Sequence, residues 1–237
     1  MTRMKRQDAV VVIAAHPDDE ALGCGGTLAL LASEGRPVHV LLLADGENSR
    51  GPDGGHRVET DRVTARSASA RSASKIMGCS SVEQMALPDN RLDGLELLDV
   101  VCYVEAFIQR HRPMTVLTHC AGDVNVDHRV VHDAVMVACR PQPGHPVKEL
   151  LFFEVPSSTE WGPAGTTTPF SPNWFVDISS TLEKKLEALH AYESELRDFP
   201  HPRSMTAVKA LAQWRGATVG VEAAEAFMLG RNIVQPR

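Results

Sequence analysis

The chain has 237 residues and a mass of 25.8 kDa, with 43% hydrophobic and 23% charged residues. This composition excludes a disordered or collagen-like chain, and the length is enough to bury an apolar core without disulfide staples. The net charge of −6 argues against a nucleic-acid or anionic-membrane binder, because both need a basic face.

Apolar runs alternate with longer amphipathic stretches along the chain. The short runs are typical of strands buried on both faces, and the leucine and valine spacing in the longer stretches predicts helices. In chain order, the sequence predicts a strand at 9–15, a helix at 21–34, a strand at 38–44, a helix at 57–77, a strand at 82–87, a helix at 95–110, a strand at 114–118, a helix at 128–139, strands at 150–155 and 174–178, and helices at 182–196, 204–215 and 221–229.

This order of elements predicts an α/β fold with a mostly parallel sheet covered by helices. We expect one domain over residues 1–237. The irregular stretch 156–172 is rich in Pro, Gly, Ser and Thr, and only about 65 residues follow it. It is therefore expected to be an active-site loop rather than a linker.

The location of the protein is predicted from what the sequence lacks. The five cysteines contain no CxxC pair, and the apolar run near the N-terminus breaks at His16-Pro17 before a signal peptide would be complete. No segment approaches the roughly 20 apolar residues of a membrane span. We expect a cytoplasmic protein with a small-molecule substrate, no nucleic-acid partner and no membrane span. The oligomeric state stays open, a homo-oligomer included.

Ligands of open parallel sheets bind beyond the carboxyl ends of the strands. At the first strand end, His16 and Asp19 are three residues apart and can face one point, where an imidazole and a carboxylate suit Zn²⁺. After a later strand, His128 offers a third ligand, with Asp127 or Asp123 to orient an imidazole. Three protein ligands and an open position are typical of a catalytic zinc site, although Fe²⁺ or Co²⁺ also suits these donors.

The glycines in Gly23-Cys24-Gly25-Gly26 follow the first predicted strand, as the glycines of a nucleotide-binding site do. Phosphate-cradling glycines lie in the turn between strand and helix. Here residues 16–20 occupy that turn, and the glycines come later in the predicted helix. We therefore expect them to allow close packing of the helix on the sheet rather than to bind a nucleotide.

Several segments together resemble one known family, the PIG-L/LmbE-like zinc-dependent N-deacetylases, in a bacterial branch of sugar and natural-product metabolism. The segments that carry the resemblance are AAHPDDEALGCGG, ADGENSR, LPDNRLDG, THCAGDVNVDHRVVHDAV, FFEVPSSTEW and FPHPRS. The resemblance implies a Rossmann-like fold, a twisted sheet with helices on both faces. It also implies zinc held by His16, Asp19 and His128, with Asp18 as general base and Asp127 supporting the histidine of the second motif.

The chain departs from the family at Asn125, where many members have a histidine that stabilises the transition state or protonates the leaving amine. An asparagine donates a hydrogen bond to an oxyanion but does not transfer a proton at neutral pH. Either Asp18 carries out both proton transfers, or another histidine such as His119 or His201 replaces the missing one.

These observations predict a zinc-dependent hydrolase that removes an acetyl group from an N-acetylated sugar or sugar-containing metabolite. Zinc lowers the pKa of its water toward about 7, Asp18 takes the proton, and the hydroxide attacks the acetamide carbonyl. Two alternatives are a zinc amidase that cleaves a larger amide, such as a thiol conjugate, and a catalytically silent metal-binding protein, which would have no use for Asp18. The predicted substrate-binding residues are Arg50, Arg66, Asp89 and Arg203, with Trp161 or Trp174 as a candidate aromatic platform.

Overall fold

The centre of the fold is a strand made only of apolar residues. In the computed structural model, which describes residues 8–47, 60–163, 165 and 167–234, β1 (Val10–Ala14) is buried along its whole length. It pairs in parallel with β2 (Val38–Ala44) on one side and β4 (Thr115–His119) on the other. Such a run is stable only where helices cover both faces of the sheet.

The sheet of the described residues has seven strands in the order β3-β2-β1-β4-β5-β7-β6. The remaining strands are β3 (Ser81–Leu87), β5 (Glu149–Phe153), β6 (Trp174–Asp177) and β7 (Ala224–Asn232). The first five strands in the spatial order are parallel, whereas β7 runs antiparallel to both of its neighbours. The sheet is therefore mostly parallel, as predicted.

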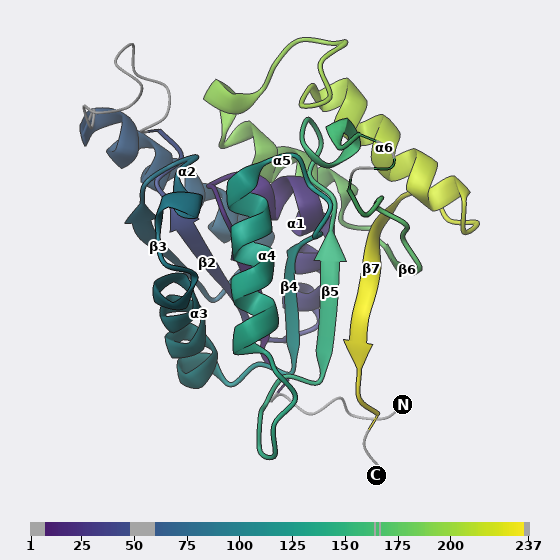
Figure 1. Ribbon diagram of the computed structural model, residues 1–237. Coiled ribbons are helices and arrows are strands. Elements are labelled where there is room, and N and C mark those ends of the chain that lie inside the picture. The colour runs from purple at the N-terminus through teal and green to yellow at the C-terminus, as the bar shows by residue number, and fades with distance from the viewer. Residues whose placement is uncertain (1–7, 48–59, 164, 166, 235–237) are drawn as a thin grey trace.

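Two helical layers cover the sheet (Figure 1). On one face, Val11 and Ile13 of β1 share a core with α3 and α4, and on the other Val10 and Val12 share a core with the remaining helices. The α-helices are α1 (Asp19–Ser33), α2 (Thr60–Met77), α3 (Leu97–His111), α4 (Val126–Ala138), α5 (Leu182–His190) and α6 (Met205–Ala217). Helices on both faces of a parallel sheet confirm the predicted α/β fold class.

The prediction of a final helix at 221–229 is wrong. This segment contains most of β7, which fills the place between β5 and β6. Its alanines favour a helix by intrinsic propensity, but the sheet environment overrides that preference. The helix predicted at 182–196 also ends earlier, at His190, and a 3₁₀ turn at Glu193–Glu195 follows it.

The glycines of α1 lie where the helix touches its neighbours. A Cβ atom on Gly23 would lie 2.4 Å from the Phe153 ring, and one on Gly26 would lie 2.7 Å from Ile178. Both distances are too short for a real contact, so these glycines permit close packing, as predicted.

None of the helices that the structure describes is both long enough and apolar enough to cross a bilayer.

Candidate metal centre and cleft

The order of the strands places the two histidine motifs next to each other. The chain runs from β1 to β2 and β3 on one side of the sheet and then returns to β4 on the other side of β1. Ligands of such sheets bind at this reversal of strand order, beyond the carboxyl ends of the strands. His16 follows β1 and His128 follows β4, so both lie at that point.

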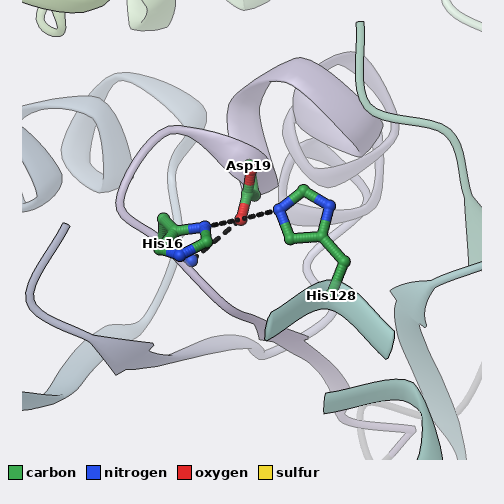
Figure 2. A group of neighbouring side chains, drawn as sticks. All are labelled: His16, Asp19 and His128. Carbon is green, nitrogen blue, oxygen red and sulfur yellow. Dashed lines mark hydrogen bonds and ion pairs between the residues drawn. The ribbon is translucent and has the colours of Figure 1, made fainter. Parts of the chain in front are cut away.

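Three side chains converge there (Figure 2). The Nδ1 atom of His16 and the Nε2 atom of His128 each lie 3.3 Å from Oδ2 of Asp19. The two imidazole rings are 5.3 Å apart between centroids. One ligand atom from each of the three residues lies within 4.8 Å of the others, a spacing that suits a shared metal ion.

The charge and hydrogen bonding of this group fit a divalent cation. Four carboxylates, each at most 2% exposed, surround the two imidazoles: Asp19, Asp89, Asp123 and Asp127. Oδ1 of Asp19 and Nε2 of His128 have no hydrogen-bond partner among the described residues. Buried polar atoms without partners are costly, and buried carboxylates need a counter-charge. A metal ion would satisfy both needs.

The pKa values of His128 and Asp19 also show that the site carries more carboxylates than cationic groups. Burial lowers the pKa of His128, but the carboxylates of Asp19 and Asp123 outweigh burial and raise it to about 9. Burial raises the pKa of Asp19, yet the neighbouring histidines hold it well below its usual value. The carboxylate of Asp19 is therefore ionised at neutral pH, as a metal ligand must be.

The resemblance implies that Asp127 supports His128, whereas the structure places Asp123, the alternative carboxylate, beside that histidine. Asp127 does not contact the histidine of its own motif; its Oδ2 lies 3.0 Å from Nε2 of His16. Asp123 instead lies 3.0 Å from Nδ1 of His128. Because an ionised carboxylate only accepts hydrogen bonds, the bond to Asp127 puts a proton on Nε2 of His16 and directs Nδ1 toward Asp19. Asp123 lies beside Nδ1 of His128, while Nε2 of that ring faces Asp19.

A second acidic group, His16 with Asp89 and Asp127, is also close enough for a metal ion. Asp127 already accepts the backbone N–H groups of Asn90 at 2.7 Å and Leu92 at 3.0 Å. Its Oδ2 also lies 3.0 Å from Nε2 of His16, and Asp89 lies 3.1 Å from the same nitrogen. These hydrogen bonds explain the group without a second ion.

Asp18 lies beside the centre without belonging to the three-residue group. It is 3% exposed, and Oδ2 accepts a hydrogen bond from Nη1 of Arg203 at 2.9 Å. Burial raises the pKa of Asp18, and Arg203 opposes that shift. Asp18 also has φ 119°, a left-handed value that is strained for a residue with a side chain.

Glu20 holds this strained backbone, a contact that sequence reasoning missed. Its Oε2 accepts the N–H of Asp18 at 3.1 Å, and its Oε1 accepts the hydroxyl of Tyr192 at 2.6 Å. From the sequence, Glu20 looks only like an acidic residue in the first turn of a helix, and no local signal links it to Tyr192. The fold brings them together across 172 residues.

Asn125 has a structural role beside its place in the cleft. Its Oδ1 accepts the N–H of Asp127 at 2.8 Å and caps the N-terminus of α4. Its Nδ2 donates to Asn90 at 3.2 Å, and the residue lines the cleft. A capping signal, Asn before a helix, was present in the sequence.

Neither alternative histidine lines the cleft. His119 is fully buried, and its Nε2 accepts the N–H of Ala15 at 2.9 Å. The ring therefore supports the turn after β1. His201 is partly exposed, and its Nδ1 accepts the N–H of Arg203 at 3.1 Å.

The cleft beside the centre has a cavity volume of about 60 Å³. Its walls include three of the four predicted substrate-binding residues, Arg66, Asp89 and Arg203. Arg50 lies outside the described residues. Nη1 of Arg66 has no hydrogen-bond partner among the described residues, whereas its Nη2 lies 2.6 Å from Glu195. Nε of Arg66 donates to Glu47 at 3.1 Å, so the guanidinium is anchored at two of its nitrogens.

Two tryptophans were candidates for an aromatic platform under the substrate. Trp174 packs against the core, whereas Trp161 is 54% exposed.

The family model described as "PIG-L: GlcNAc-PI de-N-acetylase" matches residues 11–139, more than half of the chain. The chain is also 30% identical over 200 residues to "Uncharacterized deacetylase YaiS" of Escherichia coli strain K12, covering 82% of this chain and 95% of that protein. The chain belongs to the PIG-L family.

Two further similarities show the range of named activities among proteins like this PIG-L chain. It is 30% identical over 195 residues to "Diacetylchitobiose deacetylase" of Thermococcus kodakarensis, covering 78% of this chain and 69% of that protein. It also superposes on GalB, the 4-carboxy-2-hydroxymuconate hydratase of Pseudomonas putida KT2440, with a TM-score of 0.78 and 23% identity, covering 97% and 99% of the two chains. The second match shows a shared fold.

Proposed function

We propose that this PIG-L protein is a metal-dependent hydrolase that removes the acetyl group from an N-acetylated sugar or sugar-containing metabolite. One observation carries the proposal. The group His16, Asp19 and His128 lies at the switch point of the sheet, beside Asp18, a buried carboxylate that is not part of the group. The relatives named as deacetylases support the reaction, and the diacetylchitobiose deacetylase supports the sugar substrate class.

A divalent metal held by His16, Asp19 and His128 would polarise the amide carbonyl and acidify a water molecule. Zn²⁺ is the proposed ion, and Fe²⁺ and Co²⁺ suit the same donors. The protein's own contribution to the metal is orientation. Asp127 and Asp123 fix the two imidazole rings so that one nitrogen of each faces Asp19.

Asp18 is the proposed general base and acid. Its carboxylate lies in the cleft wall with Arg203, and it takes a proton from the attacking water and returns it to the departing amine. Asp18 performs both transfers in this proposal because neither His119 nor His201 lines the cleft. Nδ2 of Asn125 is the proposed donor to the oxygen that gains negative charge.

Arg66, Asp89 and Arg203 are the proposed substrate contacts, through the hydroxyl groups and the ring oxygen of the sugar. Asp89 both lines the cleft and lies against His16, so it joins substrate binding to the metal centre. Arg66 also lines this wall, and its guanidinium is a donor for a hydroxyl group.

The direct test is to measure amine release from a set of N-acetylated sugars, with the protein as purified, after chelation, and after addition of Zn²⁺, Fe²⁺ or Co²⁺. We expect release of acetate and a free amine, loss on chelation, and recovery with metal. The Asp18→Asn variant should lose activity by about 10²- to 10⁴-fold while still binding metal.

Three other results would contradict the proposal. Release of a larger acyl group, with no acetate from acetamido sugars, would indicate an amidase. Addition of water to an unsaturated carboxylic acid, with no amine release, would indicate a hydratase, an activity named for one protein of the same fold. Metal binding with no activity, unchanged by Asp18→Asn, would indicate a silent binder.

A further inference from the structure

Glu195 lies in the wall of the cleft between two arginines. It ends the 3₁₀ turn that follows α5 and is only 4% exposed. Its Oε1 lies 2.6 Å from Nη2 of Arg66, and its Oε2 lies 3.8 Å from Nη1 of Arg203. All three residues line the cleft. A buried carboxylate is costly unless it is paired, and these two guanidinium groups supply its counter-charge.

The two arginines come from different parts of the fold, and each has a further carboxylate partner. Arg66 of α2 donates from Nε to Glu47 at 3.1 Å. Arg203 precedes α6 and donates from Nη1 to Asp18 at 2.9 Å. Glu195 therefore joins the segment after β2, through Arg66, to the proposed base, through Arg203.

These pairs determine the charge that a ligand meets in the cleft. Asp89 lies against His16 in the metal centre, and Asp18 is the proposed base, whereas Glu195 contacts both arginines. Removal of its charge would leave both guanidinium groups with less negative charge beside them. Among the described residues of the cleft wall, the arginines and carboxylates are Arg66, Arg203, Asp18, Asp89 and Glu195.

The proposed reaction changes the charge of the group that is bound in the cleft. Hydrolysis of an acetamide converts a neutral amide into an acetate ion and an amine. Guanidinium groups bind carboxylates strongly, through two parallel hydrogen bonds, so arginines without carboxylate partners would retain the acetate. Arginines that are already paired still donate hydrogen bonds to neutral oxygens, but they attract an anion less, because the neighbouring carboxylate offsets their charge.

We propose that Glu195 is a specificity-determining residue that makes the cleft select the neutral amide over the anionic product, so that acetate leaves readily. The inference rests on the proposed function. The carboxylate repels an anion in the cleft directly, and it offsets the positive charge of Arg66 and Arg203. A neutral amide meets neither effect, so the selection depends on the charge of the ligand.

The test compares acetate with acetamide, which have nearly the same size and shape and differ by one charge. Each is measured as an inhibitor of amine release and, without substrate, as a ligand of the metal-loaded protein by NMR titration at constant ionic strength. Glu195→Gln should raise the affinity for acetate relative to acetamide by about 5- to 30-fold, the effect of one unit charge at short range in a partly buried site. Glu195→Asp, which keeps the charge, should stay near the wild-type ratio.

Two further variants complete the test. Glu83→Gln is the matched control, because Glu83 also pairs with an arginine, Arg110, at 2.7 Å, but lies near the amino end of β3, away from the cleft. This variant should leave the ratio unchanged. Arg66→Gln removes a cation and keeps Glu195, so it should lower the relative affinity for acetate. The sign of that change decides the question if Glu195→Gln does not fold.

The outcomes separate the two proposals. A rise in relative acetate affinity in Glu195→Gln, with no amine released from any N-acetylated sugar, would support the role of Glu195 and contradict the deacetylase function. Amine release with a ratio that neither Glu195→Gln nor Arg66→Gln changes would overturn the role of Glu195 and leave the function intact. An equal rise in Glu83→Gln or in Glu195→Asp would also overturn that role, because the effect would then not depend on the charge of residue 195.

Discussion

At the scale of single residues, the proposed base depends on a backbone conformation that it does not adopt freely. Asp18 has φ 119°, and strain of this kind costs about 1–3 kcal/mol unless neighbouring groups hold it. Glu20 accepts the N–H of Asp18, and Tyr192 fixes Glu20 in turn. This chain of hydrogen bonds makes Glu20 and Tyr192 positioning residues for Asp18.

Removal of the Tyr192 hydroxyl tests this chain. In Tyr192→Phe, the buried carboxylate of Glu20 loses its donor, which should lower the free energy of unfolding by about 1–3 kcal/mol. We expect kcat to fall with KM and metal content unchanged, as measured by denaturation, steady-state kinetics and metal analysis.

Tyr103→Phe is the control, because Tyr103 is 42% exposed on α3 and is the only other tyrosine in the sequence. Equal effects of the two variants would show that Glu20 and Tyr192 do not position Asp18.

The carboxylates behind the histidines give a second prediction at this scale. Asp127→Asn replaces an ionised acceptor of His16 with a neutral one, which should weaken metal affinity by about 10- to 100-fold. Asp123→Asn should act in the same way through His128. A titration against a competing metal indicator measures this. Asp99→Asn on α3 serves as the control, and unchanged affinity in both site variants would refute the orienting role.

At the scale of the elements, α1 carries the metal motif at its start and is broken further along. Cys24 has non-helical backbone angles, and the next helical segment begins at the glycines. Glu225 of β7 accepts the N–H groups of Gly26 at 3.0 Å and Thr27 at 2.7 Å. The same carboxylate pairs with the buried ammonium of Lys185 on α5. Glu225 therefore ties three elements together.

We expect Glu225→Ala to lower the free energy of unfolding by about 3–5 kcal/mol, because it leaves Lys185 as a buried charge without this partner. Chemical denaturation measures the change. The control is Lys209→Ala, which removes an exposed ion pair with Glu183 at 3.8 Å and should change stability by less than about 1 kcal/mol. A small effect of Glu225→Ala would show that the pair does not hold α1.

Sequence patterns predicted those elements whose local signals agree with their tertiary surroundings. The apolar run of β1 and the glycines of α1 are examples. The strand β7 was not predictable, because its alanines favour a helix and only pairing with β5 and β6 makes it a strand.

The candidate site, like the fold, was predictable from local sequence signals but not where tertiary contacts decide. The spacing of His16 and Asp19 after a strand indicated convergence, and the structure places both near His128. The contact of Asp127 with His16, rather than with His128, goes together with the fold of residues 90–92 over Asp127. That contact spans more than 30 residues, so the sequence alone did not reveal it.

At the scale of the whole molecule, the strand order concentrates the buried acidic groups at one point. β1 and β4 are neighbours although more than 100 residues separate them, and their carboxyl ends carry both histidine motifs. The chain as a whole is acidic, with a net charge of −6, and four of its carboxylates are buried around two imidazoles. Such a concentration of charge in the fold is stable with a cation at its centre.

Metal content per chain tests this central claim most directly. It would be measured by elemental mass spectrometry on dialysed protein. The account predicts one divalent ion per chain in wild type and in Asp18→Asn, and its loss in His16→Ala and His128→Ala. His39→Ala, on β2 and stacked on His111 rather than on the site, should keep the ion. An ion retained in both His16→Ala and His128→Ala, or none in wild type supplied with Zn²⁺, would contradict the account.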